Sequence, residues 1–220
     1  MSCIHQREDF FVGLGHPRCG TGFTTSLIAS AGLDIGHEFV RENGIVSWML
    51  PAERYRNPFN DAIGPLASFP NIFCIARSPL AAIPSIIPEN HARESYKFRR
   101  HVIRERFGAD HFAALRKHGP VSVAIASYTC WFELCLGFRP GVIFRVDREA
   151  DDALLSEFLG TPVRRNDDIP RNSRPARRNK DFAPEMLADV PEPWLDRLAA
   201  LCGRLGYDED AAQIARHVGG

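Results

Sequence analysis

Four short apolar runs divide the chain into segments. They lie at 10–14 (FFVGL), 33–35 (LDI), 71–76 (NIFCIA) and 141–146 (GVIFRV). Continuous apolar runs of this length, unlike runs that alternate with polar residues, are typical of parallel strands covered on both faces. We therefore expect these segments to be strands of one parallel sheet.

Amphipathic or mainly apolar stretches lie between and after these runs and predict helices. The expected helices span 21–31, 89–107, 121–138 and 193–205. Strands that alternate with helices indicate a three-layer α/β protein, and 220 residues fit one domain over residues 1–220. The arginine- and proline-rich segment 161–181 predicts a long surface loop.

Charge and cysteine content narrow the class of protein. The chain has 27 basic and 27 acidic residues, a balance that gives no sign of a nucleic-acid or acidic-membrane partner. Six scattered cysteines and eight histidines show no metal-ligand spacing, so we expect reduced thiols and no metal. Because no apolar run has the length of a signal peptide or a membrane span, we expect a cytoplasmic protein.

The first apolar run leads into a glycine-containing turn, GHPRCGTG at 15–22, and then into the expected helix. Backbone N–H groups at a helix N-terminus form an anion site, to which Arg18 adds charge and Thr21 and Thr24 add hydroxyls. The order strand, glycine loop, helix predicts a P-loop-like fold with a central parallel sheet flanked by helices. The nucleoside-triphosphate version requires Gly-Lys followed by Ser or Thr, whereas a threonine follows Gly20 directly. A glycine-rich turn that binds nothing remains the alternative at this point.

A second pattern gives the loop a more specific meaning. The segment Pro17–Phe23 (PRCGTGF) follows the first run, and Arg77–Ser85 (RSPLAAIPS) follows the run at 71–76. Together they resemble the two cofactor signatures of the sulfotransferase family, in which a Ser stands eight positions after the second signature's Arg. This resemblance implies a bacterial or carbohydrate-type enzyme that takes the sulfuryl group from 3′-phosphoadenosine 5′-phosphosulfate (PAPS), releases 3′-phosphoadenosine 5′-phosphate (PAP) and needs no metal.

The resemblance also implies roles residue by residue. Arg18 matches the residue that contacts the sulfuryl group, and Phe23 the aromatic residue that stacks on adenine, although a helix-face core residue would also be aromatic. Cys19 replaces the family's usual Ser and Gly22 a frequent Thr, and each change removes a hydroxyl that Thr24 or backbone amides would have to replace. The implied cofactor-binding residues are Arg18, Cys19, Gly20, Thr21, Gly22, Phe23 and Thr24 at the 5′-phosphosulfate and adenine, and Arg77, Ser85 and Arg174 at the 3′-phosphate.

Sulfuryl transfer needs a base for the acceptor's proton. Glu38 follows the second short run, at a place that resembles the position of the catalytic Glu in carbohydrate-type sulfotransferases. We therefore predict Glu38 as the base, His37 as the second candidate, and Arg18 as the group that stabilises charge on the leaving phosphate. A helix cap or a surface residue is the simpler interpretation of an isolated Glu.

Three alternatives remain open. A P-loop kinase or NTPase would need a magnesium-binding Asp, for which Asp147 is the nearest candidate. A non-catalytic nucleotide-binding module would explain the changes at 19 and 22. A Cys19 nucleophile would require an Arg six positions on, where Thr25 stands. The acceptor, a small molecule, carbohydrate or lipid, is expected to contact variable loops at 39–68 and 86–118.

Overall fold

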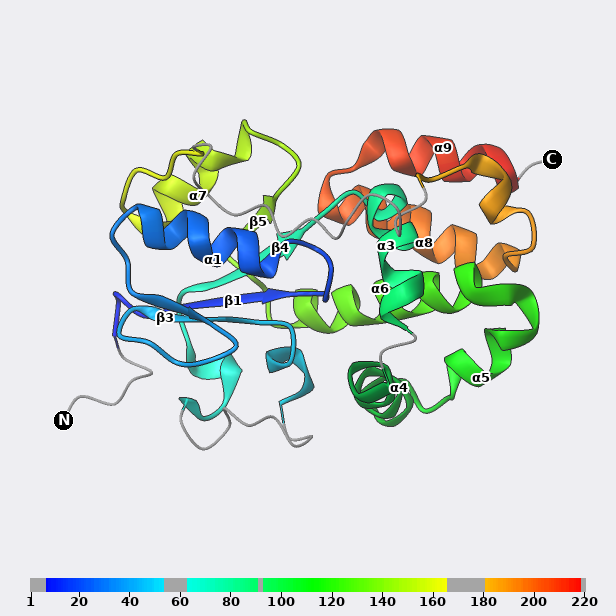
Figure 1. Ribbon diagram of the computed structural model, residues 1–220, viewed down its shortest axis with the longest axis horizontal. Coiled ribbons are helices and arrows are strands. Elements are labelled where there is room, and N and C mark those ends of the chain that lie inside the picture. Colours follow the sequence, from blue (N-terminus) through cyan, green and yellow to red (C-terminus); the bar gives the residue numbers. More distant parts are fainter. Residues whose placement is uncertain (1–6, 54–62, 91–92, 166–180, 219–220) are drawn as a thin grey trace. The chain divides into compact units, whose positions relative to one another are not determined.

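The protein is an α/β structure built on a five-stranded, all-parallel sheet in the order β2-β3-β1-β4-β5. The computed structural model describes residues 7–53, 63–90, 93–165 and 181–218. Helices flank the sheet, so the expected α/β class with a central parallel sheet is confirmed, and the arrangement is compatible with a three-layer P-loop-like fold (Figure 1). The strands are β1 Phe11–Gly15, β2 Ile35–His37, β3 Gly44–Ser47, β4 Ile72–Ala76 and β5 Val142–Arg145.

The chain divides into two compact units, Met1–Arg77 with Leu134–Asn172, and Ser78–Glu133 with Ser173–Gly220. The first unit holds the sheet with α1 Thr21–Ser30 and α7 Asp151–Leu159, and α6 Gly119–Gly137 contributes residues to both units. The other α-helices belong to the second unit: α3 Pro79–Glu89, α4 Arg93–Phe107, α5 His111–Leu115, α8 Glu192–Leu205 and α9 Asp208–Val218. Short 3₁₀ turns occur at Leu50–Ala52, Leu66–Ser68, Arg116–His118 and Pro184–Leu187. The expectation of one domain over residues 1–220 stays a prediction.

Two helices, α1 and α7, cover one face of the sheet. Phe11, Val46 and Phe73 of three neighbouring strands form one buried cluster with Leu27 of α1 and Leu155 of α7. In Figure 1, α1 runs alongside β1. Because this packing fixes α1 against the central strand, the loop between β1 and α1 has a defined position at the end of β1.

The opposite face of the sheet is also covered. Phe10 lies with its ring centroid 5.5 Å from that of Phe69, and Cys74 of β4 interacts with Cys135 near the end of α6. All four residues are buried. Burial on both faces explains why the strands appear in the sequence as continuous apolar runs.

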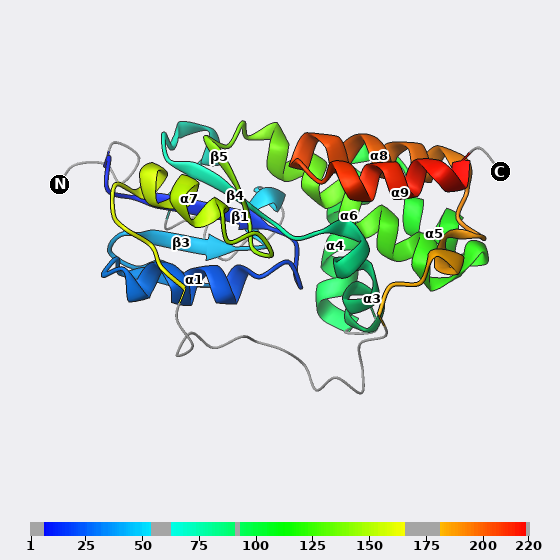
Figure 2. The ribbon, with the colours of Figure 1, turned by 90° about the horizontal axis from the view of Figure 1, so that it is seen from above.

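In the second unit, described by itself, the regular elements among the described residues are all helices. Figures 1 and 2 both show α8 and α9 side by side. Leu198, Leu201 and Leu205 of α8 are buried, which confirms the predicted apolar face of the helix at 193–205. Trp131 of α6 is fully buried.

Several predicted boundaries were wrong. The expected helix 89–107 ends where predicted but begins four residues later, as α4 from Arg93, because Glu89 is the last residue of α3. The strand expected at 33–35 lies two residues later, as β2. Both stretches expected to be variable loops contain regular structure. β3 lies within 39–68, and most of 86–118 belongs to the end of α3, α4 and α5. Of the loop expected at 161–181, residues 166–180 lie outside the described residues.

One helical stretch in the described part of the chain, His111–Gly137, is long and apolar enough to span a membrane by length and composition. Most of it is buried inside the protein, and the core helix of a soluble protein meets the same two criteria. The expectation that the chain has no membrane span therefore stays a prediction.

Candidate functional site

The candidate site lies at the carboxyl edge of the parallel sheet. In open α/β sheets, ligands bind outside the carboxyl ends of the strands, where the strand order reverses. Here β1 lies between β3 and β4, so the loop after β1 occupies such a point. The polar residues that end or follow the strands at this edge are Arg18 after β1, Glu38 after β2, Ser47 at the end of β3, Arg77 after β4 and Asp147 after β5.

The loop after β1 is held in an unusual backbone conformation. Arg18 has φ 76° and Gly20 has φ 91°, both in the left-handed region. A Cβ atom on Gly20 would also lie 2.9 Å from Cγ1 of Val146, which leaves room only for glycine. Gly20 is the N-cap of α1 and has no side chain with which to cap it, and the first turn of α1 has no acidic residue. These features suit the start of α1 to an anion that approaches the backbone N–H groups.

Two threonines of α1 direct their hydroxyls to the helix itself. Thr24 donates to the carbonyl oxygen of Gly20 at 3.0 Å, and Thr25 donates to that of Thr21 at 3.0 Å. The hydroxyl of Thr21 instead contacts His37 Nε2 at 3.2 Å. Of these three hydroxyls, that of Thr21 is therefore the one directed away from its own helix toward the candidate base.

Cys19 lies in the interior of the protein. Its side chain is fully buried, and burial raises the pKa of the thiol well above its usual value, although the charges of Arg77 and Arg18 act in the opposite direction. Because the thiolate is the reactive form, a nucleophilic Cys19 is not supported. The charges of Arg77 and Asp147, which follow β4 and β5, also act on the pKa of this thiol, so both residues lie near the loop.

Phe23 is half-buried and packs against the core cluster between the sheet and α1 and α7. The guanidinium carbon of Arg165 lies 5.5 Å from its ring centroid. Arg165 is itself held by both carboxylate oxygens of Asp152 at 2.9 Å and by the carbonyl of Val146 at 2.7 Å. These contacts favour the core interpretation of Phe23, and its stacking on adenine stays a prediction.

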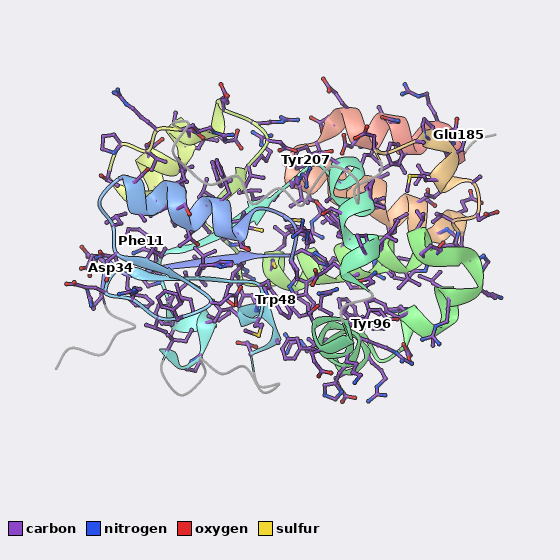
Figure 3. All side chains as sticks on the ribbon, viewed as in Figure 1. Phe11, Asp34, Trp48, Tyr96, Glu185 and Tyr207 are labelled. Atoms are coloured by element: carbon purple, nitrogen blue, oxygen red, sulfur yellow. The ribbon has the colours of Figure 1, made fainter. Side chains whose placement is uncertain are left out.

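Glu38 is fixed beside the end of β3. Its Oε2 accepts a hydrogen bond from Ser47 Oγ at 2.5 Å, and its Oε1 accepts one from the backbone N–H of Trp48 at 3.3 Å. Trp48 is labelled in Figure 3. The Glu38 side chain is 24% exposed, so it is partly accessible to solvent. Burial raises the pKa of Glu38 above its usual value, and the two hydrogen bonds partly oppose this effect.

His37 connects the loop to Glu38. Its Nε2 lies 3.2 Å from Thr21 Oγ1 and 3.7 Å from Glu38 Oε1. Burial lowers the pKa of His37, which favours the neutral imidazole at pH 7. The structure therefore joins Thr21, His37, Glu38 and Ser47 in one continuous line of polar contacts at the edge of the sheet.

The second predicted signature is divided between the two units. Arg77 ends the segment Met1–Arg77 of the first unit, whereas Ser85 is buried in α3 of the second unit. Each unit is described by itself, so the pairing of Arg77 with Ser85 stays a prediction. Arg174 lies outside the described residues.

The N-terminus of α3 already has a carboxylate partner within the second unit. Asp210 Oδ2 accepts hydrogen bonds from Ser78 Oγ at 2.6 Å and from the backbone N–H of Leu80 at 3.2 Å. Sequence reasoning missed this contact because 132 positions separate Ser78 from Asp210. The contact shows that α3 is capped by α9.

Sequence reasoning also missed Ser47 and Arg165. Ser47 ends a four-residue strand that the apolar pattern did not reveal, and Arg165 lies within the stretch 161–181 that was expected to be a surface loop. Among the described residues, no group of three or more His, Cys, Asp or Glu side chains is placed to hold a metal ion. A metal-free mechanism stays a prediction.

Comparisons of the chain with protein-family models, curated proteins and solved structures gave no match. The resemblance to sulfotransferases therefore rests on the residues of the two signatures, Pro17–Phe23 and Arg77–Ser85.

Proposed function

We propose that the protein is a sulfotransferase that moves the sulfuryl group of PAPS directly to a hydroxyl or amine of an acceptor. The observation that carries this proposal is the contact of Thr21 Oγ1 with His37 Nε2, which places the start of α1 next to Glu38. An anion site and a carboxylate base within one line of polar contacts are what a direct group transfer requires.

The donor is proposed to bind with its 5′-phosphosulfate at the loop after β1. The left-handed Arg18 and Gly20 shape this loop, and the positive end of the α1 dipole favours a bound anion. Arg77 lies close enough to influence the pKa of Cys19 in the same loop. By resemblance to the family, Arg77 and Ser85 bind the 3′-phosphate, Arg174 closes over it, and PAP is the product.

The proposed chemistry is a single displacement at sulfur. The acceptor oxygen or nitrogen forms a bond to sulfur while the bond from sulfur to the bridging phosphate oxygen breaks, and the leaving phosphate keeps the electron pair. Glu38 accepts the acceptor's proton, and Arg18 stabilises the negative charge that develops on the phosphate. His37, neutral at pH 7, is the second candidate for the base.

The rival kinase interpretation is disfavoured by the sequence of the loop, which lacks the lysine that a nucleoside triphosphate requires. Its candidate magnesium-binding residue, Asp147, follows β5. Asp147 lies near the loop, because its charge raises the pKa of the Cys19 thiol and the preceding residue, Val146, faces Gly20. The titration below therefore includes ATP with magnesium.

Isothermal titration with PAP, beside ATP with magnesium, tests the proposal. We expect PAP to bind without metal, and Arg18→Ala and Arg77→Ala each to weaken binding by at least about tenfold, because charge-assisted contacts are worth roughly 1.5–3 kcal/mol. Arg104→Ala is the matched control, because Arg104 is exposed and pairs with the adjacent Glu105.

The outcomes separate the three interpretations. Binding of ATP with magnesium in preference to PAP would support the kinase. PAP binding without sulfuryl transfer from ³⁵S-labelled PAPS to pools of phenols, saccharides and lipids would favour a non-catalytic module. If neither nucleotide binds, the sulfotransferase proposal is wrong.

A further inference from the structure

Ser47 is the last residue of β3, and its side chain is fully buried. Strand alternation places it on the face of the sheet opposite to Val46, which belongs to the core cluster with α1. A buried serine at the end of a strand needs partners for its hydroxyl. Those partners define what the residue does.

The direction of the Ser47 hydroxyl is set by two contacts. The backbone N–H of Met49 donates to Ser47 Oγ at 3.0 Å, so this oxygen acts as an acceptor on one side. The hydroxyl proton is donated to Glu38 Oε2. The turn that follows β3 therefore orients the hydroxyl toward Glu38.

Both carboxylate oxygens of Glu38 are held by this same turn. Ser47 Oγ binds Oε2, and the backbone N–H of Trp48 binds Oε1. The backbone of Glu38, in the left-handed region at φ 62°, also pairs with β3, because its N–H donates to the carbonyl of Val46 at 3.0 Å. The position of the carboxylate is thus determined by β3 and the turn after it as much as by β2, which Glu38 follows.

Charged groups do not account for this arrangement. Among the described residues, the titratable group in contact with Glu38 is His37, at 3.7 Å from Nε2 to Oε1, and burial favours its neutral form. From α1 the polar group nearest this line is the Thr21 hydroxyl, which contacts His37. Hydrogen bonds from the turn after β3 are therefore what stabilises an ionised Glu38 against burial.

We propose that Ser47 is a positioning residue that holds the Glu38 carboxylate in the orientation and charge state needed to accept a proton. The catalytic meaning of this inference rests on the proposed sulfotransferase function. The control of Glu38 by Ser47 does not depend on that function. The inference about Ser47 and the proposed function can therefore fail separately.

The test is a pH titration of the Glu38 side-chain carboxyl carbon by NMR on ¹³C-labelled protein, with the resonance assigned by its loss in Glu38→Gln. Ser47→Ala removes the donor and little volume. We expect this variant to shift the Glu38 titration to higher pH. Burial raises the pKa of Glu38, and the variant lacks the Ser47 hydrogen bond that lowers it. Ser47→Thr retains a hydroxyl and is expected to restore the wild-type titration. Ser30→Ala, which removes a hydroxyl bonded to the Leu27 carbonyl, is the matched control.

The result that would overturn the inference is a Glu38 titration that is the same in Ser47→Ala as in the wild type. A PAP titration of the same proteins keeps the two proposals apart, because Ser47 has no assigned contact with the donor and Ser47→Ala should bind PAP as the wild type does. If the wild type does not bind PAP, the proposed function fails, while the NMR titration still decides whether Ser47 controls Glu38.

Discussion

The hydroxyl of Thr21 lies 3.2 Å from Nε2 of His37, so the first residue of α1 is joined to the last residue of β2. The two residues are 16 positions apart and lie on neighbouring elements of one unit. His37 is also 3.7 Å from the carboxylate of Glu38. Any anion bound at the start of α1 therefore sits at one end of a polar path whose other end is the candidate base.

Replacing Thr21 with valine tests this path. The Thr21→Val side chain has nearly the same shape but no hydroxyl, so His37 loses a partner and the loop loses a donor. We expect PAP to bind about tenfold more weakly, as for one lost hydrogen bond of about 1 kcal/mol or slightly more. Ser26→Ala, which removes a hydroxyl bonded to the Gly22 carbonyl, serves as the control in the same titration. Equal affinity in wild type and Thr21→Val would contradict this role.

A second prediction concerns the backbone of the loop. Gly20→Ala places a Cβ in a left-handed conformation and 2.9 Å from Val146 Cγ1, so strain and a steric clash add together. Gly160 has φ 66° but no atom within 4 Å of the added Cβ, so Gly160→Ala introduces strain alone. We expect urea denaturation to show a loss of about 3 kcal/mol for Gly20→Ala and about 1 kcal/mol for Gly160→Ala. Equal losses would show that the clash with Val146 does not matter.

The third prediction tests whether Cys19, which stands where sulfotransferases usually have a Ser, affects donor binding. The thiol of Cys19 is fully buried, so we do not expect the hydroxyl of Cys19→Ser to reach a bound anion and restore a donor. We expect unchanged PAP affinity and a loss of about 1–3 kcal/mol in the free energy of unfolding, because a hydroxyl is buried where a thiol was. Alkylation of the folded wild type by iodoacetamide at pH 8 should also leave Cys19 unmodified. Tighter PAP binding by Cys19→Ser would show that the side chain does reach the ligand.

Local patterns were sufficient to predict three strands and the loop between β1 and α1. The apolar runs at 10–14, 71–76 and 141–146 correspond to β1, β4 and β5. β1 and β4 are buried along their whole length and need no polar positions, whereas β5 is an edge strand and only partly buried. The glycine-containing turn and the position of Glu38 after β2 also follow from short stretches of sequence. These features depend on neighbours close in the chain.

The features that were missed depend on pairing between distant segments or on weak local signals. β3 has only four residues, and it is a strand because it pairs with β1 and β2. Ser47 acquires a role only through that pairing. α3 contains Pro84 and Pro88, which normally argue against a helix interior, and its start is stabilised by Asp210 from α9.

The fourth prediction is a pH dependence of stability caused by Glu38. Burial raises the pKa of Glu38 in the folded protein, so the protonated form is favoured there relative to the unfolded chain. Its contribution to stability is therefore fully present below the pKa of the unfolded chain and is lost as the pH rises through the raised pKa. Glu38→Gln removes this term, so the variant should gain stability relative to the wild type between pH 4 and pH 8 in urea denaturation. A constant difference across this range would contradict the raised pKa.

The pH dependence of stability caused by Asp151 should have the opposite sign to that caused by Glu38. It is buried at the start of α7, and although burial alone would raise its pKa, side-chain and backbone hydrogen bonds from Arg145 lower it overall. The ionised carboxylate therefore stabilises the folded protein above the unfolded-state pKa, and this contribution is lost as the pH falls through the lowered value.

Asp151→Asn leaves the Arg145 guanidinium without its charged partner, so we expect a loss of about 3 kcal/mol at pH 7. The loss should become smaller as the wild type is acidified, because its Asp151 then becomes neutral as well. Urea denaturation at pH 7 and at several values below pH 4 measures this change, with Asp189→Asn as the control because Asp189 is exposed. A loss that stays the same at every pH would mean that the geometry of the Asp151 hydrogen bonds, and not the charge of the carboxylate, holds the end of β5 to α7.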